Sequence, residues 1–512
     1  ESDEVNKGRF ADKFEDLLAN IPDAALVEEL QRTHSFLGNL IGLSWEGSLY
    51  EQLDPELRFE NTLDGLKALF KAESLRRPLI LHLEDAHWWD HDSQTFLTRL
   101  TRNVQDYSFA LLITSRQELP DSIFEPAVPQ KQIQLRALAQ ESVAELAQDI
   151  IGHAPSPSLV NLLQERTQGN PFFVEQIMLY LQEHDLLETI GAQSARTLPG
   201  DVYIPTDVRA VLTARLDRLP FDIKDLVQKA AVLGREFDTT ILEAMVENDI
   251  DLDSCLSAGI SERVWLNSGP ASYVFHHALL RDAAYDMQLG ARLRQLHSRA
   301  ATTYEQVYPD PARAPHYAQI AFHYDRAEET EHAQNYYGAA GGHAKGEYSN
   351  EDAIAYFGRA LELTNASDFE ARYDYLAERE TIFQWLGNRD LQRGDLKQLK
   401  KVIEILADDR KKADLALRQS SFALVTGNYD GALDKVRRAL EYARAANDTL
   451  AEARSYHRQG RTVWQQGHGQ EAEGYLNKAL PLAKTSQDSH LEVECQYDLA
   501  MVHRLQGHYE RA

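Results

Sequence analysis

Cysteine is nearly absent from this chain, since only Cys255 and Cys495 occur among 512 residues. Two thiols so far apart supply no disulfide framework and no thiolate zinc site, and a reducing, cytoplasmic compartment fits them. No run approaches the roughly 18 consecutive apolar residues of a membrane span, and no signal peptide is visible. Positive charge is also scarce, with 53 Lys and Arg against 80 Asp and Glu and a formal net charge of −27. That balance argues against a chain that coats nucleic acid or a membrane surface.

Common catalytic signatures are missing as well. The sequence has no G-x-x-x-x-G-K-[ST] loop to cradle a triphosphate, no HExxH motif, no clustered Cys and His ligands and no G-x-S-x-G nucleophile turn. Interpretations as a metalloprotease or a hydrolase therefore have no support, and no cyclase or kinase catalytic residues are visible. What remains is an ordinary globular composition, 43% apolar and 26% charged. The length predicts about three or four domains.

Residues 1–135 predict part of an α/β fold. Apolar residues recur at helical spacing in 1–75, and the period then changes to two short apolar runs, Leu79–Leu83 and Phe109–Ile113. A helical stretch, Ser93–Val104, lies between these runs. Strand, helix and strand with apolar runs of this kind indicate a parallel sheet.

Helices are predicted for almost all of the rest of the chain. From Ser142 onward every periodic segment is helical, except for short strand candidates near Val264–Leu266 and Tyr273–Phe275. Pro199-Gly200 and Ile204-Pro205 predict a linker before a new domain.

A 40-residue repeat dominates the C-terminal part. Gly387, Gly427, Gly467 and Gly507 fall 40 residues apart, and each allows a tight turn between paired helices. Small residues at fixed offsets let two helices approach closely. They are Ala432, Ala472, Ala512, Ala439 and Ala479. An upstream unit that fits the template less well contains Tyr324, Ala333, Tyr337 and Ala340.

These repeats resemble tetratricopeptide repeats in a long-helix variant, and a generic helical solenoid is the alternative. Either way we expect a curved stack with a concave surface that receives a protein or small-molecule signal. The last unit stops at Ala512 before its second helix is complete, which would leave an apolar face uncovered, and the chain begins with Glu1 rather than Met. We therefore expect a piece of a longer protein.

The predicted strand Leu79–Leu83 ends in two carboxylates, Glu84 and Asp85. Such a pair at the carboxyl end of a parallel strand can hold Mg²⁺ and polarise an attacking water beside a triphosphate. Two like charges at a buried strand end are costly without a cation or a partner. The alternative is an acidic turn before a helix that Asp92 or Ser93 caps.

The wider string PLILHLEDAHWWD resembles the Walker B segment of STAND proteins, the AAA-type signal-transduction ATPases. It is most similar to the subgroup fused to bacterial class III adenylate cyclases, protein kinases and transcription regulators. The string matches their pattern except that His82 interrupts the apolar strand. The resemblance implies that Glu84 or Asp85 holds Mg²⁺ and acts in catalysis, with Asp85 favoured as the residue that orients the water.

Two further segments follow in the order of that family. Thr114-Ser115-Arg116 after the second strand resembles its sensor, which implies that Arg116 reaches the γ-phosphate, for which a guanidinium is well suited, and that Thr114 also belongs to the nucleotide site. Gly169-Asn170-Pro171-Phe172-Phe173 resembles its Gly-x-Pro motif, which implies that Pro171 packs against the base or ribose and that Asn170 also belongs to the nucleotide site. The alternatives are a surface arginine and a plain helix start with Pro at its first position.

Residues 204–300 resemble the winged-helix domain of the family. The string FHHALLRDAAYD is similar to the Met-His-Asp segment of its plant and animal members, which implies that His277 lies near the β-phosphate of bound ADP. A capping or packing role is the alternative. Asp and Glu outnumber Lys and Arg in 201–300, so we expect an internal packing module and no contact with nucleic acid.

The expected organisation is a partial NTPase core over 1–135, a helical lid over 136–200, a winged-helix-like domain over 201–312 and tetratricopeptide-like repeats over 313–512. The resemblance implies a regulatory switch that binds ATP or ADP with Mg²⁺ in a larger protein, with an adenylate cyclase as the output domain, and it leaves oligomerisation on activation open. In the family the phosphate-binding loop lies upstream, so this chain alone should bind ATP weakly or not at all. The alternatives are a non-enzymatic repeat scaffold and a repeat-containing transcription activator with a DNA-binding domain after residue 512.

Overall fold

The computed structural model describes residues 3–120, 123–126, 128–183, 207–246 and 251–506. The protein is mostly helical with few strands. It separates into two compact units, one of Glu1–Arg99, Tyr107–Leu119 and Gln334–Ala512 and one of Leu100–Asp106 and Pro120–Ala333. The predicted linker around Pro199 and the last repeat positions, Gly507 and Ala512, lie outside the described residues. In the part of the chain that is described, no helix combines the length and apolar character needed to cross a bilayer.

The N-terminal part of the first unit is a helical bundle beside a small sheet. Its elements are α1 (Asp3–Ala19), α2 (Ala24–Asn39), α3 (Leu49–Gln52), α4 (Pro55–Arg76), β1 (Leu79–Leu83), the 3-10 helix η1 (Ala86–Trp88), α5 (His91–Leu100) and β2 (Phe109–Ile113). The aliphatic and aromatic positions that repeat at helical spacing in α1, α2 and α4 pack into one core, represented by Phe14, Leu30 and Ala72. This core confirms the helical prediction for the first 75 residues.

The two predicted strands form a parallel pair, in which Leu79 is opposite Phe109 and Leu83 is opposite Ile113. Alternate side chains point to opposite faces of a strand. The face that carries Ile80 is exposed, with 70% of that residue accessible, whereas the Leu79 face is half-buried. The predicted helix between the strands ends earlier than expected, at Leu100 rather than Val104, because turns follow and one of their residues, Asn103, adopts a φ of 53°.

The second unit begins with a three-helix cluster formed by α6 (Gln140–Ile151), α7 (Pro157–Thr167) and α8 (Pro171–Glu183). Its core is made of aliphatic side chains that include Val143, Leu163 and Ile177. The next elements are α10 (Val208–Asp217), α11 (Phe221–Leu233), β3 (Glu236–Asp238), α12 (Thr239–Met245), α13 (Leu252–Ser261), β4 (Trp265–Gly269), β5 (Ser272–Phe275) and α14 (Ala278–Asp286). The unit then continues through α15 (Gly290–Val307), the 3-10 helix η3 (Ala314–His316) and α16 (Tyr317–Arg326).

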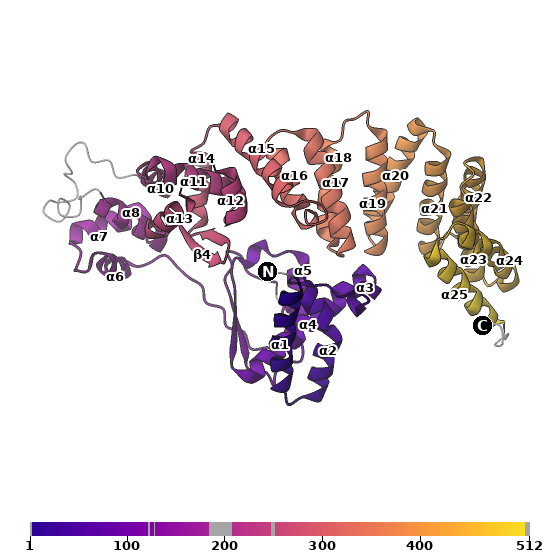
Figure 1. Ribbon diagram of the computed structural model, residues 1–512, viewed down its shortest axis with the longest axis horizontal. Helices are drawn as coiled ribbons and strands as arrows, with labels where there is room; N and C mark the ends of the chain where they lie inside the picture. The colour runs from indigo at the N-terminus through magenta and orange to yellow at the C-terminus, as the bar shows by residue number, and fades with distance from the viewer. Residues whose placement is uncertain (1–2, 121–122, 127, 184–206, 247–250, 507–512) are drawn as a thin grey trace. The chain divides into compact units, whose positions relative to one another are not determined.

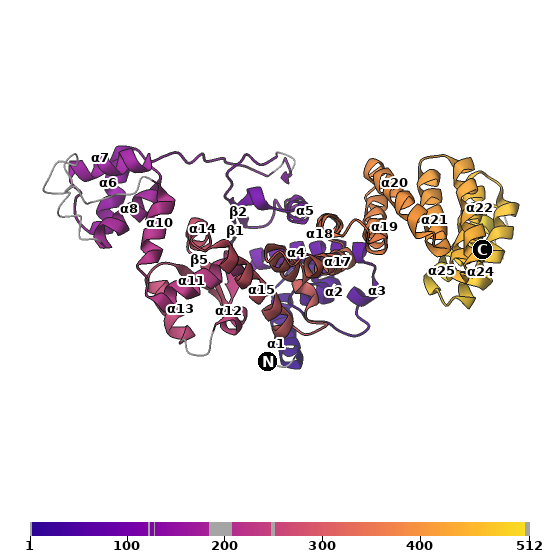
Figure 2. The same cartoon turned by 90° about the horizontal axis from the view of Figure 1, so that it is seen from above.

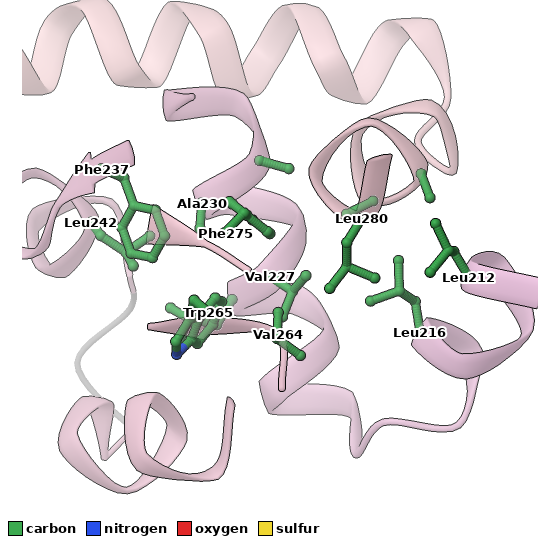
Figure 3. Close-up of a cluster of buried hydrophobic side chains, with 14 of the residues drawn as sticks. Leu212, Leu216, Val227, Ala230, Phe237, Leu242, Val264, Trp265, Phe275 and Leu280 are labelled. Atoms are coloured by element: carbon green, nitrogen blue, oxygen red, sulfur yellow. The ribbon is translucent and has the colours of Figure 1, made fainter. Parts of the chain in front are cut away.

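An antiparallel sheet of β3, β5 and β4 lies among these helices, with β5 in the middle. The two strands predicted near Val264–Leu266 and Tyr273–Phe275 are confirmed as β4 and β5, and β3 was not predicted because it has only three residues, two of them acidic. Figure 3 shows the core around Trp265, whose ring is fully buried and whose Nε1 donates a hydrogen bond to the Leu256 carbonyl at 2.9 Å. Side chains from α10 to α14 complete this core.

The C-terminal part consists of antiparallel helices in series (Figures 1 and 2). They are α17 (Thr330–Gly346), α18 (Asn350–Leu363), α19 (Phe369–Trp385), α20 (Arg389–Leu406), α21 (Asp409–Val425), α22 (Tyr429–Ala445), α23 (Thr449–Gln465), α24 (Gly469–Thr485) and α25 (Ser489–Leu505). The 40-residue glycine register is confirmed, because Gly387, Gly427 and Gly467 sit between paired helices with φ of 69°, 77° and 89°. The predicted close-approach residues are fully buried, as at Ala432 and Ala472.

Candidate functional site

The carboxyl ends of β1 and β2 are joined by a short hydrogen-bond network. Thr114 donates its backbone N–H to the Leu83 carbonyl at 3.0 Å, and its own carbonyl accepts from the Ala86 N–H at 2.8 Å. The Thr114 hydroxyl accepts a hydrogen bond from the backbone N–H of Asp85 at 3.1 Å. Because parallel strands end at the same edge, the predicted acidic pair and the predicted sensor threonine are brought together.

Asp85 itself adopts the left-handed conformation, with φ 52° and ψ 45°. Such a backbone is uncommon for a residue other than glycine and recurs at functional sites. The Glu84 side chain is exposed and lies 3.9 Å from His82 through its Oε1, and Arg116 is exposed two residues beyond Thr114. Among the described residues, no group of three or more His, Cys, Asp and Glu side chains is arranged to hold a metal ion.

The start of α8 is a tight, well-capped turn. Gly169 adopts a φ of 74°, and a Cβ there would lie 2.3 Å from the Leu138 carbonyl oxygen, so only glycine fits. Asn170 caps the helix, because its Oδ1 accepts from the Phe173 N–H at 3.2 Å. Asn170 and Pro171 are exposed, and Phe173 is buried in the core of the α6–α8 cluster. The local geometry is that of a helix start with Pro at the first position, the alternative that the sequence had left open.

His277 lies directly before α14 and packs on the α8 start. Its ring centroid is 4.1 Å from that of Phe172 and 4.5 Å from that of His276. Burial lowers the pKa of the His277 imidazole, the neighbouring His276 ring lowers it further, and Glu175 acts in the opposite direction. Its Nε2 atom is buried and has no hydrogen-bond partner among the described residues.

Two sequence motifs that are about a hundred residues apart therefore meet at this place. The lining of the small cleft between them also includes charged and amide side chains that the sequence did not single out, at Glu175, Gln176, Arg215 and Arg263. Arg263 forms an ion pair with Glu175 at 3.0 Å, and Arg215 donates to Gln176. The cleft holds only about 10 Å³, the space of one water, so in this conformation it admits no nucleotide.

The predicted nucleotide residues thus form two groups. Glu84, Asp85, Thr114 and Arg116 belong to the first compact unit, and Asn170, Pro171 and His277 belong to the second. Within each unit the predicted segments lie next to one another.

Known proteins match parts of the chain. Residues 413–485 match a family model for the tetratricopeptide repeat, which confirms the predicted repeat type over that segment. An uncharacterized protein of Rhizobium meliloti (strain 1021) is 24% identical over 331 residues, which are 63% of this chain. The chain spans 31% of the length of that curated relative.

Solved structures are similar at low sequence identity. One is a signal transduction ATPase with numerous domains (STAND) protein with a tetratricopeptide repeat sensor from Pyrococcus horikoshii, at 14% identity and a TM-score of 0.39, covering 95% of this chain and 73% of that chain. Another is a Rap protein complexed with competence and sporulation factor, at 16% identity and a TM-score of 0.33, covering 46% and 68%. A third is YrrB, a tetratricopeptide repeat protein with an unusual peptide-binding site, at 18% identity and a TM-score of 0.28, covering 40% and 91%.

Proposed function

We propose that this chain is the switch and sensor portion of an ATP-dependent signalling protein of the STAND type. The nucleotide site would be completed by a phosphate-binding loop elsewhere in the intact protein, and the helical repeats would receive the signal. The observation that carries the proposal is the bond from the Asp85 N–H to the Thr114 hydroxyl, at 3.1 Å. It places an acidic strand end and a Thr-Ser-Arg sequence at one edge of a parallel sheet, where α/β proteins bind ligands.

The donor set at this edge fits Mg²⁺ held jointly with a nucleotide. Two carboxylates, those of Glu84 and Asp85, offer the oxygen ligands that Mg²⁺ prefers, and both side chains are at least partly exposed. Because two carboxylates do not fill an octahedral shell, phosphate oxygens and waters would supply the remaining ligands. Bound ATP with Mg²⁺ would supply the phosphoryl group whose hydrolysis resets the switch.

The residues of this chain would act around that nucleotide in distinct roles. The Asp85 carboxylate would orient the attacking water, and the left-handed backbone of Asp85, held by Thr114, would fix its direction. The Arg116 guanidinium would bind the γ-phosphate as a fork of donors. The orphaned Nε2 of His277 would gain a partner if a phosphate of ADP reached it, which supports a role as the latch of the resting state.

The elements from α10 to β5 support the winged-helix part of this proposal. Their order is helix, helix, strand, helix, helix, strand, strand, and the last two strands form an antiparallel hairpin. This module and the repeats would close on ADP and open on ATP, which requires a differential affinity of only a few kcal/mol. An adenylate cyclase remains the output domain that we propose.

A non-enzymatic repeat scaffold is the second candidate. It is favoured by the match of residues 413–485 to the tetratricopeptide repeat family model. The two candidates differ in ATP turnover by the intact protein.

The test uses the intact protein and the Asp85→Asn variant. We expect the substitution to abolish ATP hydrolysis in a coupled assay while the Kd for ATP, measured by calorimetry, stays within about threefold. Glu118→Gln, at an exposed carboxylate beyond Arg116, is the matched control and should leave both quantities unchanged. Hydrolysis that survives Asp85→Asn would refute the site, and an intact protein without hydrolysis would favour the scaffold. The 512-residue chain alone should show no micromolar affinity for ATP.

A further inference from the structure

A basic groove lies within the helical repeats, on α20, α21 and α22. It encloses about 610 Å³, a size typical of ligand sites. Six cationic side chains line it, and the lining contains a single carboxylate, that of Glu404. The cationic residues are Arg393, Lys397, Lys400, Lys412, Lys435 and Arg438. This local excess of positive charge is notable in a chain whose formal net charge is −27, because the average surface is acidic.

Three of these cations have no ion-pair partner among the described residues, namely Lys397, Lys400 and Lys435. Neighbouring groove residues are neutralised by carboxylates on their own helices, as Lys412 is by Asp409 at 2.8 Å. Like charges gathered without partners repel one another. Binding of an anionic group relieves this repulsion and is therefore electrostatically favourable.

The floor of the groove is apolar. Aliphatic side chains from two helices, Leu396, Ile403 and Leu415, line it together with the rings of Phe422 and Tyr442. The Arg393 guanidinium lies 5.4 Å above the Phe422 ring, and the Lys412 ammonium lies 5.6 Å from the Tyr442 ring. Two of the six cations therefore make cation–π contacts with aromatic rings of the groove. A ligand that matches this groove has apolar side chains below and acidic side chains at its edges.

We propose that this groove binds an acidic peptide segment of a partner protein, whose apolar side chains enter between α20 and α21 while its carboxylates meet the unpaired lysines. This inference deepens the proposed function, because it rests on the repeats as the signal-receiving part and names the chemistry of the signal. A small inorganic anion would leave the apolar floor uncovered, and a nucleic acid would face repulsion from the acidic remainder of the chain.

The test is a selection of random 12-residue peptides, displayed on phage, against the 512-residue chain. We expect the selected peptides to be rich in Asp and Glu with apolar residues at intervals. Their affinity is then measured by fluorescence polarisation for a triple variant that carries Lys397→Glu, Lys400→Glu and Lys435→Glu. It should fall at least about tenfold, because three attractive charge contacts become repulsive. Their affinity should also fall with rising salt concentration.

Lys401→Glu is the matched control. Lys401 is an exposed lysine on the same helix that does not line the groove, so its reversal should leave peptide affinity within about twofold. Thermal unfolding checks that the triple variant folds. If it does not, the single variants at Lys397 and Lys400, which are both exposed, are measured instead, each with an expected loss of about threefold or more.

Other results would overturn the proposal. These are a selection that yields no peptides, or peptides without an acidic bias, and an affinity that survives the charge reversal. Tighter binding of inorganic triphosphate, or of a 20-nucleotide single-stranded DNA, than of the selected peptides would also contradict it. Because none of these measurements uses ATP hydrolysis, they can succeed when the nucleotide switch fails, and the Asp85→Asn test can succeed when the groove binds nothing.

Discussion

The imidazole rings of His297 and His323 meet through their Nδ1 atoms, which lie 2.9 Å apart in the buried interior of the second unit. His297 comes from α15 and His323 from α16, and the Tyr285 hydroxyl bonds to Nε2 of His297 at 2.8 Å. Burial lowers the pKa of His297 to about 4, with the cations of Arg326 and Arg281 adding to the effect. Burial also lowers the pKa of His323 to about 3, and the His297 ring adds to it.

This pair predicts a loss of stability in mild acid. Both pKa values are depressed from 6.5, so between pH 6.5 and pH 4 the unfolded chain binds protons that the folded chain does not. The two neutral imidazoles therefore contribute fully to the free energy of unfolding above about pH 6.5, and this contribution is lost as the pH falls. We expect a loss on the order of 2 kcal/mol per imidazole by pH 5. Urea unfolding at pH 7.5 and pH 5 measures it.

The matched variants are His297→Gln with His323→Gln, and His490→Gln. The double variant removes both titrations, so its stability should fall less than that of the parent over the same pH interval. His490 is highly exposed, with 86% of its side chain accessible, and its replacement should leave the pH profile unchanged. An equal loss in the parent and the double variant would show that the pair does not carry the pH dependence.

A buried carboxylate among the repeats leads to a second prediction. The Glu380 side chain is fully buried, and its oxygens accept from Arg418 Nη1 and from Gln392 Nε2, both at 2.7 Å. The same guanidinium donates to the Asp414 carboxylate through Nε at 2.7 Å. Removing one partner of a buried ion pair leaves an uncompensated charge. We therefore expect Arg418→Met to lower the free energy of unfolding by about 3–5 kcal/mol in chemical denaturation.

Two further variants separate lost charge from lost packing. Adding Glu380→Gln to Arg418→Met removes the stranded charge and should recover a large part of the stability. Arg359→Met breaks an exposed pair with Glu362 and should change the free energy of unfolding by less than about 1 kcal/mol. A loss at Arg418 no larger than that at Arg359 would contradict the prediction.

The repeat register shows what the sequence can predict well. Turn positions obey local rules, so glycines 40 residues apart predict tight turns between paired helices, and Gly427 makes such a turn with a φ of 77°. A second signal at the same spacing is equally local. Aspartates cap every second helix through their side chains, and they are Asp368, Asp408, Asp448 and Asp488. Cap residues at the repeat period therefore mark the starts of these helices.

Features that depend on packing between helices were not predictable. The meeting of the two strand ends was predictable, because parallel pairing fixes which residues are neighbours. The Asp85–Thr114 bond follows from that register. The contact of Phe172 with His277 depends on how α8 packs against α14, and no local rule sets that. The cations of the basic groove come from three helices. On each helix their spacing is that of an ordinary solvent-exposed face. Its charge becomes visible only once the helices are assembled.

The close approach of Gly259 to Trp265 gives the last prediction. A Cβ at Gly259 would lie 2.3 Å from Cε2 of the fully buried indole, closer than any real contact, and the indole cannot move without breaking its bond to the Leu256 carbonyl. Alanine favours a helix over glycine by about 1 kcal/mol, so propensity alone predicts that Gly259→Ala stabilises α13. Overpacking costs about 1–3 kcal/mol, and we expect that cost to prevail, with a lower Tm and altered near-UV circular dichroism from the indole.

Gly394→Ala is the control for this substitution, because Gly394 lies inside α20 and a Cβ there meets nothing within 4 Å. Only the propensity term operates at that position, so the variant should gain about 0.5–1 kcal/mol. The two substitutions are chemically identical, and their opposite signs in one urea titration would isolate the contact with the indole. Stabilisation by Gly259→Ala would mean that the indole has room to shift, which would contradict the tight packing around Trp265.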